Sequence, residues 1–189
     1  MEQKINLPNL LTMLRILSTV CLMLFPPHSL WFISIYTLAG ITDVLDGYIA
    51  RKTGKTTDFG AKLDSAADLF FYAVMLLRIF PVLWEMLPWQ IWLLVGAVLV
   101  VRLSAYGIAA VKYRCFAARH TWLNKATGFM VFVIPYMLPS PVGVAFCWAV
   151  GIVAMLASAE ELVLHLITKT YDPRVKSIFS RLKPGQKTK

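Results

Sequence analysis

Half of the ten acidic residues of this 189-residue chain lie in one short stretch of sequence. They are Asp43, Asp46, Asp58, Asp64 and Asp68. All but Asp58 fall inside strongly hydrophobic segments, where an ionised carboxylate near the middle of a bilayer costs at least ~2.5–3.5 kcal/mol. This cost predicts that the four side chains face a shared polar cavity instead of lipid.

The spacing of these aspartates places each pair on one face of a helix. Asp43 and Asp46 are three residues apart in one predicted helix, and Asp64 and Asp68 are four apart in the next. The two helices run in opposite directions from the short polar loop between them. Both pairs are therefore expected at a similar depth, on adjacent helices, in the cytoplasmic half of the membrane.

Four neighbouring carboxylates repel one another unless cations neutralise them. Hard oxygen ligands suit Mg²⁺, Mn²⁺ or Ca²⁺, and the stretch contains no His or Cys that would favour zinc. Gly47 and Gly60 lie close to the aspartates, where a missing side chain would let a diphosphate or a helix approach. Arg51 follows Asp43 on roughly the same face and could bind phosphate. A structural ion pair or a proton relay explains one intramembrane acid more readily than four at this spacing.

The elements that must position these residues are membrane helices. Hydrophobic residues make up 58% of the chain, charged residues 15%, and the mean hydropathy is +0.66, whereas soluble domains carry about 25% charge. The composition excludes disordered, collagen-like and disulfide-scaffold classes. It predicts an all-α, polytopic membrane protein with six transmembrane helices. The predicted spans run from about Leu10 to Phe25, Leu30 to Ala50, Phe59 to Phe80, Trp89 to Val111, Leu123 to Leu138 and Val142 to Thr168.

Prolines and basic residues predict where the spans end and how they are oriented. Pro26 is expected to stop the first span and Pro81 the third. With a cytoplasmic N-terminus, every lysine and arginine except Arg78 falls at an inner end, in an inner loop or in the tail. The positive-inside rule therefore predicts two cytoplasmic termini and an active-site cavity that opens to the cytoplasmic side.

The same distribution of charge bears on domains and partners. The net charge of +9 is expected to reflect orientation and an anionic lipid surface, not nucleic-acid binding. We expect one six-helix membrane domain, residues 1–168, followed by a basic cytoplasmic tail, residues 169–189.

The acidic stretch also resembles a known family. The pattern Asp43-x2-Asp46-Gly47-x2-Ala50-Arg51-x8-Gly60-x3-Asp64-x3-Asp68 is similar, at every defined position, to the signature of the CDP-alcohol phosphatidyltransferases. The resemblance implies an enzyme of phospholipid biosynthesis that transfers a phosphatidyl group from CDP-diacylglycerol to an alcohol and releases CMP.

The resemblance further implies which residues form the site. A divalent-metal site, usually holding two Mg²⁺ or Mn²⁺ ions, is implied at Asp43, Asp46, Asp64 and Asp68. Asp68 is also implied as the general base. CDP-diacylglycerol is implied to bind at Gly47, Arg51, Thr57 and Gly60. The family further implies a homodimer in the bacterial cell membrane.

A second polar set is basic and concerns the acceptor alcohol. Arg102 lies deep in the fourth predicted span, and Lys125 enters the fifth, so both favour an acceptor that carries a phosphate. An ion pair of Arg102 with Glu160 or Glu161, formed only for folding, is the alternative, and the other cations could serve only to orient the chain. The candidate acceptor-binding residues are Arg102, Lys112, Arg114 and Lys125.

The opening segment bears on the same question. NLPNLLTMLRIL, residues Asn6–Leu17, resembles the start of phosphatidylglycerophosphate synthases, which implies glycerol 3-phosphate as acceptor. However, Leu69 stands where those synthases usually carry lysine, and the stretch Leu63–Asp68 is similar to phosphatidylserine synthases. Serine and inositol phosphate therefore stay open as acceptors. An ion or anion carrier is the alternative class, although no second gate is visible near the outer loops.

Overall fold

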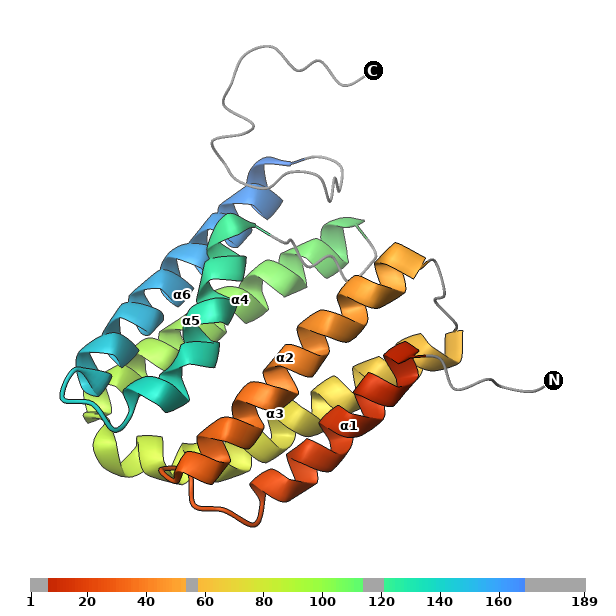
Figure 1. The fold of residues 1–189 in the computed structure, drawn as a ribbon. Coiled ribbons are helices and arrows are strands. Elements are labelled where there is room, and N and C mark those ends of the chain that lie inside the picture. Colours follow the sequence, from red (N-terminus) through yellow and green to blue (C-terminus); the bar gives the residue numbers. More distant parts are fainter. Residues whose placement is uncertain (1–6, 54–57, 114–120, 169–189) are drawn as a thin grey trace. The chain divides into compact units, whose positions relative to one another are not determined.

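The structure, a computed structural model, describes residues 7–53, 58–113 and 121–168, and every regular element in these ranges is a helix (Figure 1). The helices are α1 (Leu7–Leu22), α2 (Leu30–Thr53), α3 (Asp58–Met86), α4 (Trp89–Tyr113), α5 (Trp122–Met137) and α6 (Gly143–Ile167). Within these ranges, three segments are long and apolar enough to cross a membrane: Lys62–Met86, Trp89–Tyr113 and Gly143–Ile167. An integral membrane protein has helices of this kind.

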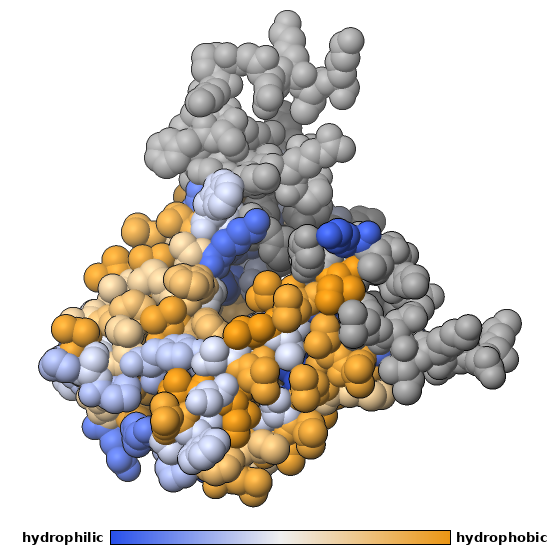
Figure 2. All heavy atoms as spheres, in the orientation of Figure 1, coloured by the Kyte–Doolittle hydropathy of each residue, from blue (hydrophilic) through white to orange (hydrophobic). Residues whose placement is uncertain are grey.

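The chain divides into two compact units, Met1–Met86 and Leu87–Lys189. In the first unit α1 packs against both α2 and α3, and in the second α6 packs against both α4 and α5. Large apolar side chains are exposed on all six helices, and hydrophobic residues are widespread on the visible surface (Figure 2). Such a surface is stable when hydrocarbon surrounds it.

Local hydrogen bonds shape the turn between α1 and α2. The N–H groups of Met23 and Leu24 bond to carbonyls three residues earlier, which tightens the end of α1. Pro26 has no backbone N–H with which to extend a helix. Ser29 then caps α2, because its Oγ accepts a backbone N–H of the first turn at 3.1 Å. The first helix accordingly ends at Leu22, slightly before the predicted end.

The prediction that Pro81 ends the third helix was wrong. α3 continues through Pro81 to Met86, and α5 likewise contains Pro135. A proline removes one N–H and crowds the carbonyl one turn earlier, but membrane helices tolerate it because neighbouring groups satisfy the freed carbonyl. The 29 residues of α3 span about 44 Å at 1.5 Å per residue.

Small residues bring α4 and α6 close together in the second unit. Gly151 of α6 is buried, and a β-carbon placed there would lie 2.6 Å from Cδ2 of Leu94 in α4. Ala105 and Ala109 of α4 and Ala157 of α6 are fully buried. Membrane helices commonly pack through small residues in this way.

Side chains at the end of α4 also donate hydrogen bonds to the last carbonyls of α6 and to the residue that follows it. Lys112 Nζ donates to the carbonyls of His165 at 2.8 Å and Leu166 at 2.9 Å. The hydroxyl of Tyr113 donates to the carbonyl of Thr168 at 2.9 Å. The last carbonyls of a helix lack intrahelical donors, so these bonds satisfy them and tie the two helix ends together.

Candidate metal centre and active site

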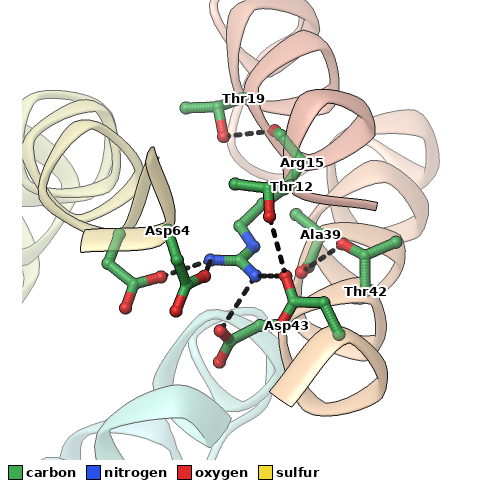
Figure 3. Close-up of polar contacts among 9 residues, drawn as sticks. Thr12, Arg15, Thr19, Ala39, Thr42, Asp43 and Asp64 are labelled. Atoms are coloured by element: carbon green, nitrogen blue, oxygen red, sulfur yellow. Dashed lines mark hydrogen bonds and ion pairs between the residues drawn. The ribbon is translucent and has the colours of Figure 1, made fainter. Parts of the chain in front are cut away.

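The four aspartates predicted from their spacing lie together in the first unit. α2 supplies Asp43 and Asp46, and α3 supplies Asp64 and Asp68. All four carboxylates contact one guanidinium, that of Arg15 in α1 (Figure 3). Three helices therefore build one compact cluster, called here the Arg15–aspartate cluster.

Arg15 lies at the centre of this cluster and contacts carboxylates of both α2 and α3. Its Nη2 lies 3.1 Å from Asp43 Oδ1 and also contacts Asp46. Its Nη1 lies 3.1 Å from Asp64 Oδ1 and also contacts Asp68. A guanidinium presents its N–H donors in a planar fork, which explains how one side chain can bind carboxylates on two helices.

The four carboxylates differ in their access to the surface of this unit. The Asp46 side chain is 5% exposed and also accepts a hydrogen bond from Thr12 Oγ1 at 3.3 Å. The side chains of Asp43, Asp64 and Asp68 are 50%, 42% and 41% exposed. Asp46 and Arg15 therefore form the buried side of the cluster, and the other three carboxylates form its accessible side.

α1 contributes a polar face that the sequence analysis did not recognise as part of the site. Thr12, Arg15 and Thr19 are three and four residues apart and all are buried. The Thr19 hydroxyl donates to the Arg15 carbonyl at 2.7 Å, which satisfies it within an apolar helix. The sequence did contain a signal for this role, namely an arginine inside an apolar segment, because such an arginine requires an anionic partner.

The accessible side of the cluster fits a divalent cation. Asp43, Asp64 and Asp68 each offer a carboxylate oxygen, and these oxygens lie within 4.8 Å of one another. Oxygen-only donors with open sides suit Mg²⁺ or Mn²⁺, which retain water or phosphate ligands. Four carboxylates and one guanidinium leave a formal charge of about −3 on the cluster, so Arg15 alone does not neutralise it.

The residues predicted to bind CDP-diacylglycerol lie in the sequence between the two pairs of aspartates. Gly60 lies in α3, one turn before Asp64. For Gly47 and Arg51 the structure describes only the helical backbone, within α2. Thr57 lies outside the described residues.

In the second unit Arg102 is linked to an acidic residue through a side chain that the sequence analysis missed. Arg102 Nη2 donates to Asn124 Oδ1 at 2.5 Å, and Asn124 Nδ2 donates to Glu161 Oε2 at 3.1 Å. Thr121 caps α5 by accepting the Asn124 N–H at 3.2 Å, which fixes Asn124 in the first turn. Glu161 is 1% exposed, so this relay anchors Arg102 to a buried carboxylate.

The other basic candidates have different settings. The Lys112 ammonium is bound to the last carbonyls of α6. Lys125 is exposed, and its Nζ lies 5.3 Å from the centroid of the Trp122 ring. Arg114 lies outside the described residues. The structure therefore brings the four aspartates together, whereas the basic candidates that it describes occupy separate settings.

Comparison with known proteins bears on the chain as a whole. A family model described as CDP-alcohol phosphatidyltransferase matches residues 5–159. The chain is 32% identical over 168 residues to a CDP-diacylglycerol–glycerol-3-phosphate 3-phosphatidyltransferase of Pseudomonas fluorescens, a match that covers 84% of this chain and 85% of the relative. No solved structure matches significantly.

Two shorter matches differ from each other in the acceptor that their names give. An enzyme of Haemophilus influenzae with the same name as the Pseudomonas relative is 46% identical over 70 residues, 34% of this chain and 38% of the relative. A CDP-diacylglycerol–serine O-phosphatidyltransferase of Methanocaldococcus jannaschii is 38% identical over 112 residues, 57% of this chain and 52% of the relative. Because the family match spans the aspartates and most of both units, the chain belongs to the CDP-alcohol phosphatidyltransferase family.

Proposed function

We propose that this protein transfers the phosphatidyl group of CDP-diacylglycerol to glycerol 3-phosphate and releases CMP. The observation that carries the proposal is the convergence of Asp43, Asp46, Asp64 and Asp68 at one point of the first unit. The name of the Pseudomonas relative, which aligns with most of this chain, supports glycerol 3-phosphate as the acceptor.

In this proposal the four aspartates bind two divalent metal ions, which are Mg²⁺ or Mn²⁺. Asp43, Asp64 and Asp68 provide the accessible oxygens, and Asp46 completes the set from the buried side. The metal, when bound, supplies positive charge to the diphosphate and to the departing CMP. Gly47, Arg51, Thr57 and Gly60 bind the CDP part of the donor, since three of them lie within or beside the aspartate-bearing turns of α2 and α3.

Asp68 is proposed to act as the general base as well as a metal ligand. A carboxylate within reach of the acceptor hydroxyl can take its proton as the oxygen attacks the phosphatidyl phosphorus. The bond from phosphorus to the CMP oxygen breaks in the same displacement. The Asp68 side chain is 41% exposed, which is consistent with contact to a substrate.

The acceptor phosphate is proposed to bind the basic residues of the second unit, Arg102, Lys112, Arg114 and Lys125. Arg102 supports this best, because its Nε is buried and has no hydrogen-bond partner among the described residues. A buried charged donor favours an anionic partner. Serine is the second candidate acceptor, because the Methanocaldococcus relative is named for that reaction. Inositol phosphate is the third.

The reaction is proposed to take place in the membrane. Six helices within residues 1–168 cross it as one domain, with both termini in the cytoplasm and a polar cavity that opens on that side. Residues 169–189 form a basic tail that lies near anionic lipid, and two copies associate in the bacterial cell membrane. The exposed apolar surface and the three long apolar segments among the described residues support the location in the membrane.

The decisive experiment measures CMP release by the purified full-length chain in lipid nanodiscs. CDP-diacylglycerol is offered with glycerol 3-phosphate, serine or inositol phosphate, with Mg²⁺ or with excess chelator. We expect metal-dependent CMP release with glycerol 3-phosphate. The matched control is Asp64→Asn, which removes a carboxylate charge from the cluster and is expected to abolish release.

Other outcomes would assign other functions. If CMP were released with serine but not with glycerol 3-phosphate, serine would be the acceptor. Full release in excess chelator would refute the metal centre. No CMP release with any acceptor, together with metal-dependent ion or anion flux into proteoliposomes, would favour the carrier.

A further inference from the structure

Arg15 and a divalent cation have overlapping sets of ligands. Arg15 lies in α1, outside the acidic pattern on α2 and α3, yet it contacts Asp43, Asp64 and Asp68. The same three carboxylates form the group that could hold a metal ion. Because guanidinium and metal are both cations, each lowers the affinity of the cluster for the other.

The burial of Arg15 means that its charge needs the carboxylates as partners. Its side chain is 1% exposed, and a buried charge without a paired anion is strongly destabilising. In turn, four neighbouring carboxylates without a cation would push α2 and α3 apart. Before metal binds, Arg15 and the carboxylates therefore stabilise each other.

One carboxylate differs from the others as a partner for Arg15. Asp46 is 5% exposed and is also held by Thr12, which lies one turn before Arg15 on the same helix. The other three carboxylates are about half exposed and can turn towards a metal.

We propose that Arg15 is a built-in counter-cation that holds the aspartate cluster together before metal binds and yields Asp43, Asp64 and Asp68 to the metal. Asp46, which also accepts a hydrogen bond from Thr12, then keeps the guanidinium on the buried side of the cluster. Arg15 is thus a positioning residue, which holds the carboxylates in place for the metal. This proposal rests on the metal centre of the proposed function.

The test measures Mn²⁺ binding, without turnover, by electron paramagnetic resonance of the full-length protein in nanodiscs. Arg15→Gln removes the competing charge, so Mn²⁺ should bind at least about tenfold more tightly than to the wild type. In excess chelator the same variant should melt at a lower temperature than the wild type, and saturating Mn²⁺ should narrow that difference. The matched control is Arg78→Gln, because Arg78 lies in the same unit but donates to the Phe25 carbonyl at 2.5 Å; Mn²⁺ affinity should stay unchanged.

A second variant tests the proposal if Arg15→Gln does not fold. Arg15→Lys keeps the charge but lacks the planar fork that reaches both helices. It should bind Mn²⁺ more tightly than the wild type, by a smaller factor than Arg15→Gln. Equal or weaker Mn²⁺ binding in the variant that folds would overturn the proposal, as would a wild type that binds no Mn²⁺.

These results are separate from those that decide the proposed function. A wild type that releases CMP, combined with an Arg15 variant of unchanged Mn²⁺ affinity, would refute only the counter-cation. A wild type that releases no CMP, combined with tighter Mn²⁺ binding by Arg15→Gln, would refute only the transferase.

Discussion

Each aspartate of the Arg15–aspartate cluster has its own environment, and the environments suggest a division of labour. Asp46 is buried against Arg15 and Thr12, whereas Asp68 is exposed enough to meet a substrate. A buried carboxylate with two donors is suited to holding structure. An accessible one is suited to accepting a proton.

Asp68→Asn tests this division. The amide keeps the size of the carboxylate but cannot accept the proton, so we expect turnover to fall by about 10²- to 10⁴-fold. Binding of CDP-diacylglycerol, measured with a fluorescent analogue, should change little. A parallel loss of donor binding and turnover would instead identify Asp68 as a metal ligand only.

Arg102→Ala tests the acceptor. Removing a charge-assisted contact of ~1.5–3 kcal/mol should raise the KM for glycerol 3-phosphate by roughly 10- to 150-fold, with little change in the KM for CDP-diacylglycerol. Asn124→Ala is the matched variant, because it removes the relay to Glu161 but keeps the charge; we expect a smaller rise. A lower melting temperature with both KM values unchanged would show that Arg102 serves only folding.

At the residue scale the sequence predicted the aspartates because their chemistry is local. Pairs three and four residues apart share a helical face whatever the rest of the chain does. Arg15 was missed as their partner, since it lies 31 and 53 residues before Asp46 and Asp68. Helical periodicity carries no information about contacts at such separations. Asn124 was missed for the same reason.

Helix existence was predictable from apolar blocks, but helix ends depended on local bonding. The third helix passes through Pro81 because one missing hydrogen bond does not outweigh the apolar residues that follow. The first helix ends before Pro26 because the last turn tightens. Turn geometry of this kind is weakly encoded in hydropathy.

The contact between α4 and α6 yields a prediction about packing. Gly151→Val would place side-chain atoms against Leu94, whose Cδ2 lies only 2.6 Å from a β-carbon at that position. Overpacking typically costs about 1–3 kcal/mol, so the melting temperature in detergent should fall. Leu94→Ala should restore part of the loss in the double variant.

Gly96→Ala is the control for this pair, because nothing lies within 4 Å of a β-carbon at Gly96. Its melting temperature should match or exceed that of the wild type, since alanine favours helix. If Gly151→Val were as stable as Gly96→Ala, the close approach of the two helices would be wrong.

For the whole molecule, the orientation predicted from the lysines and arginines has a direct test. Green fluorescent protein fused after Lys189 should fluoresce in bacterial cells, because it folds in the cytoplasm but not after export in an unfolded state. Alkaline phosphatase at the same position should be inactive for the opposite reason. The reverse pattern would place the C-terminus outside and contradict the positive-inside assignment.

The buried position of Arg15 has a consequence for the biogenesis of the protein. α1 leaves the ribosome before α2 and α3, and an arginine in a lone apolar helix costs about 2.5–3.5 kcal/mol on insertion scales. Its carboxylate partners arrive only with α2 and α3. The first helix should therefore stay beside the translocon until α3 emerges, and glycosylation mapping of truncated chains should show stable insertion of α1 only in those that include Asp68.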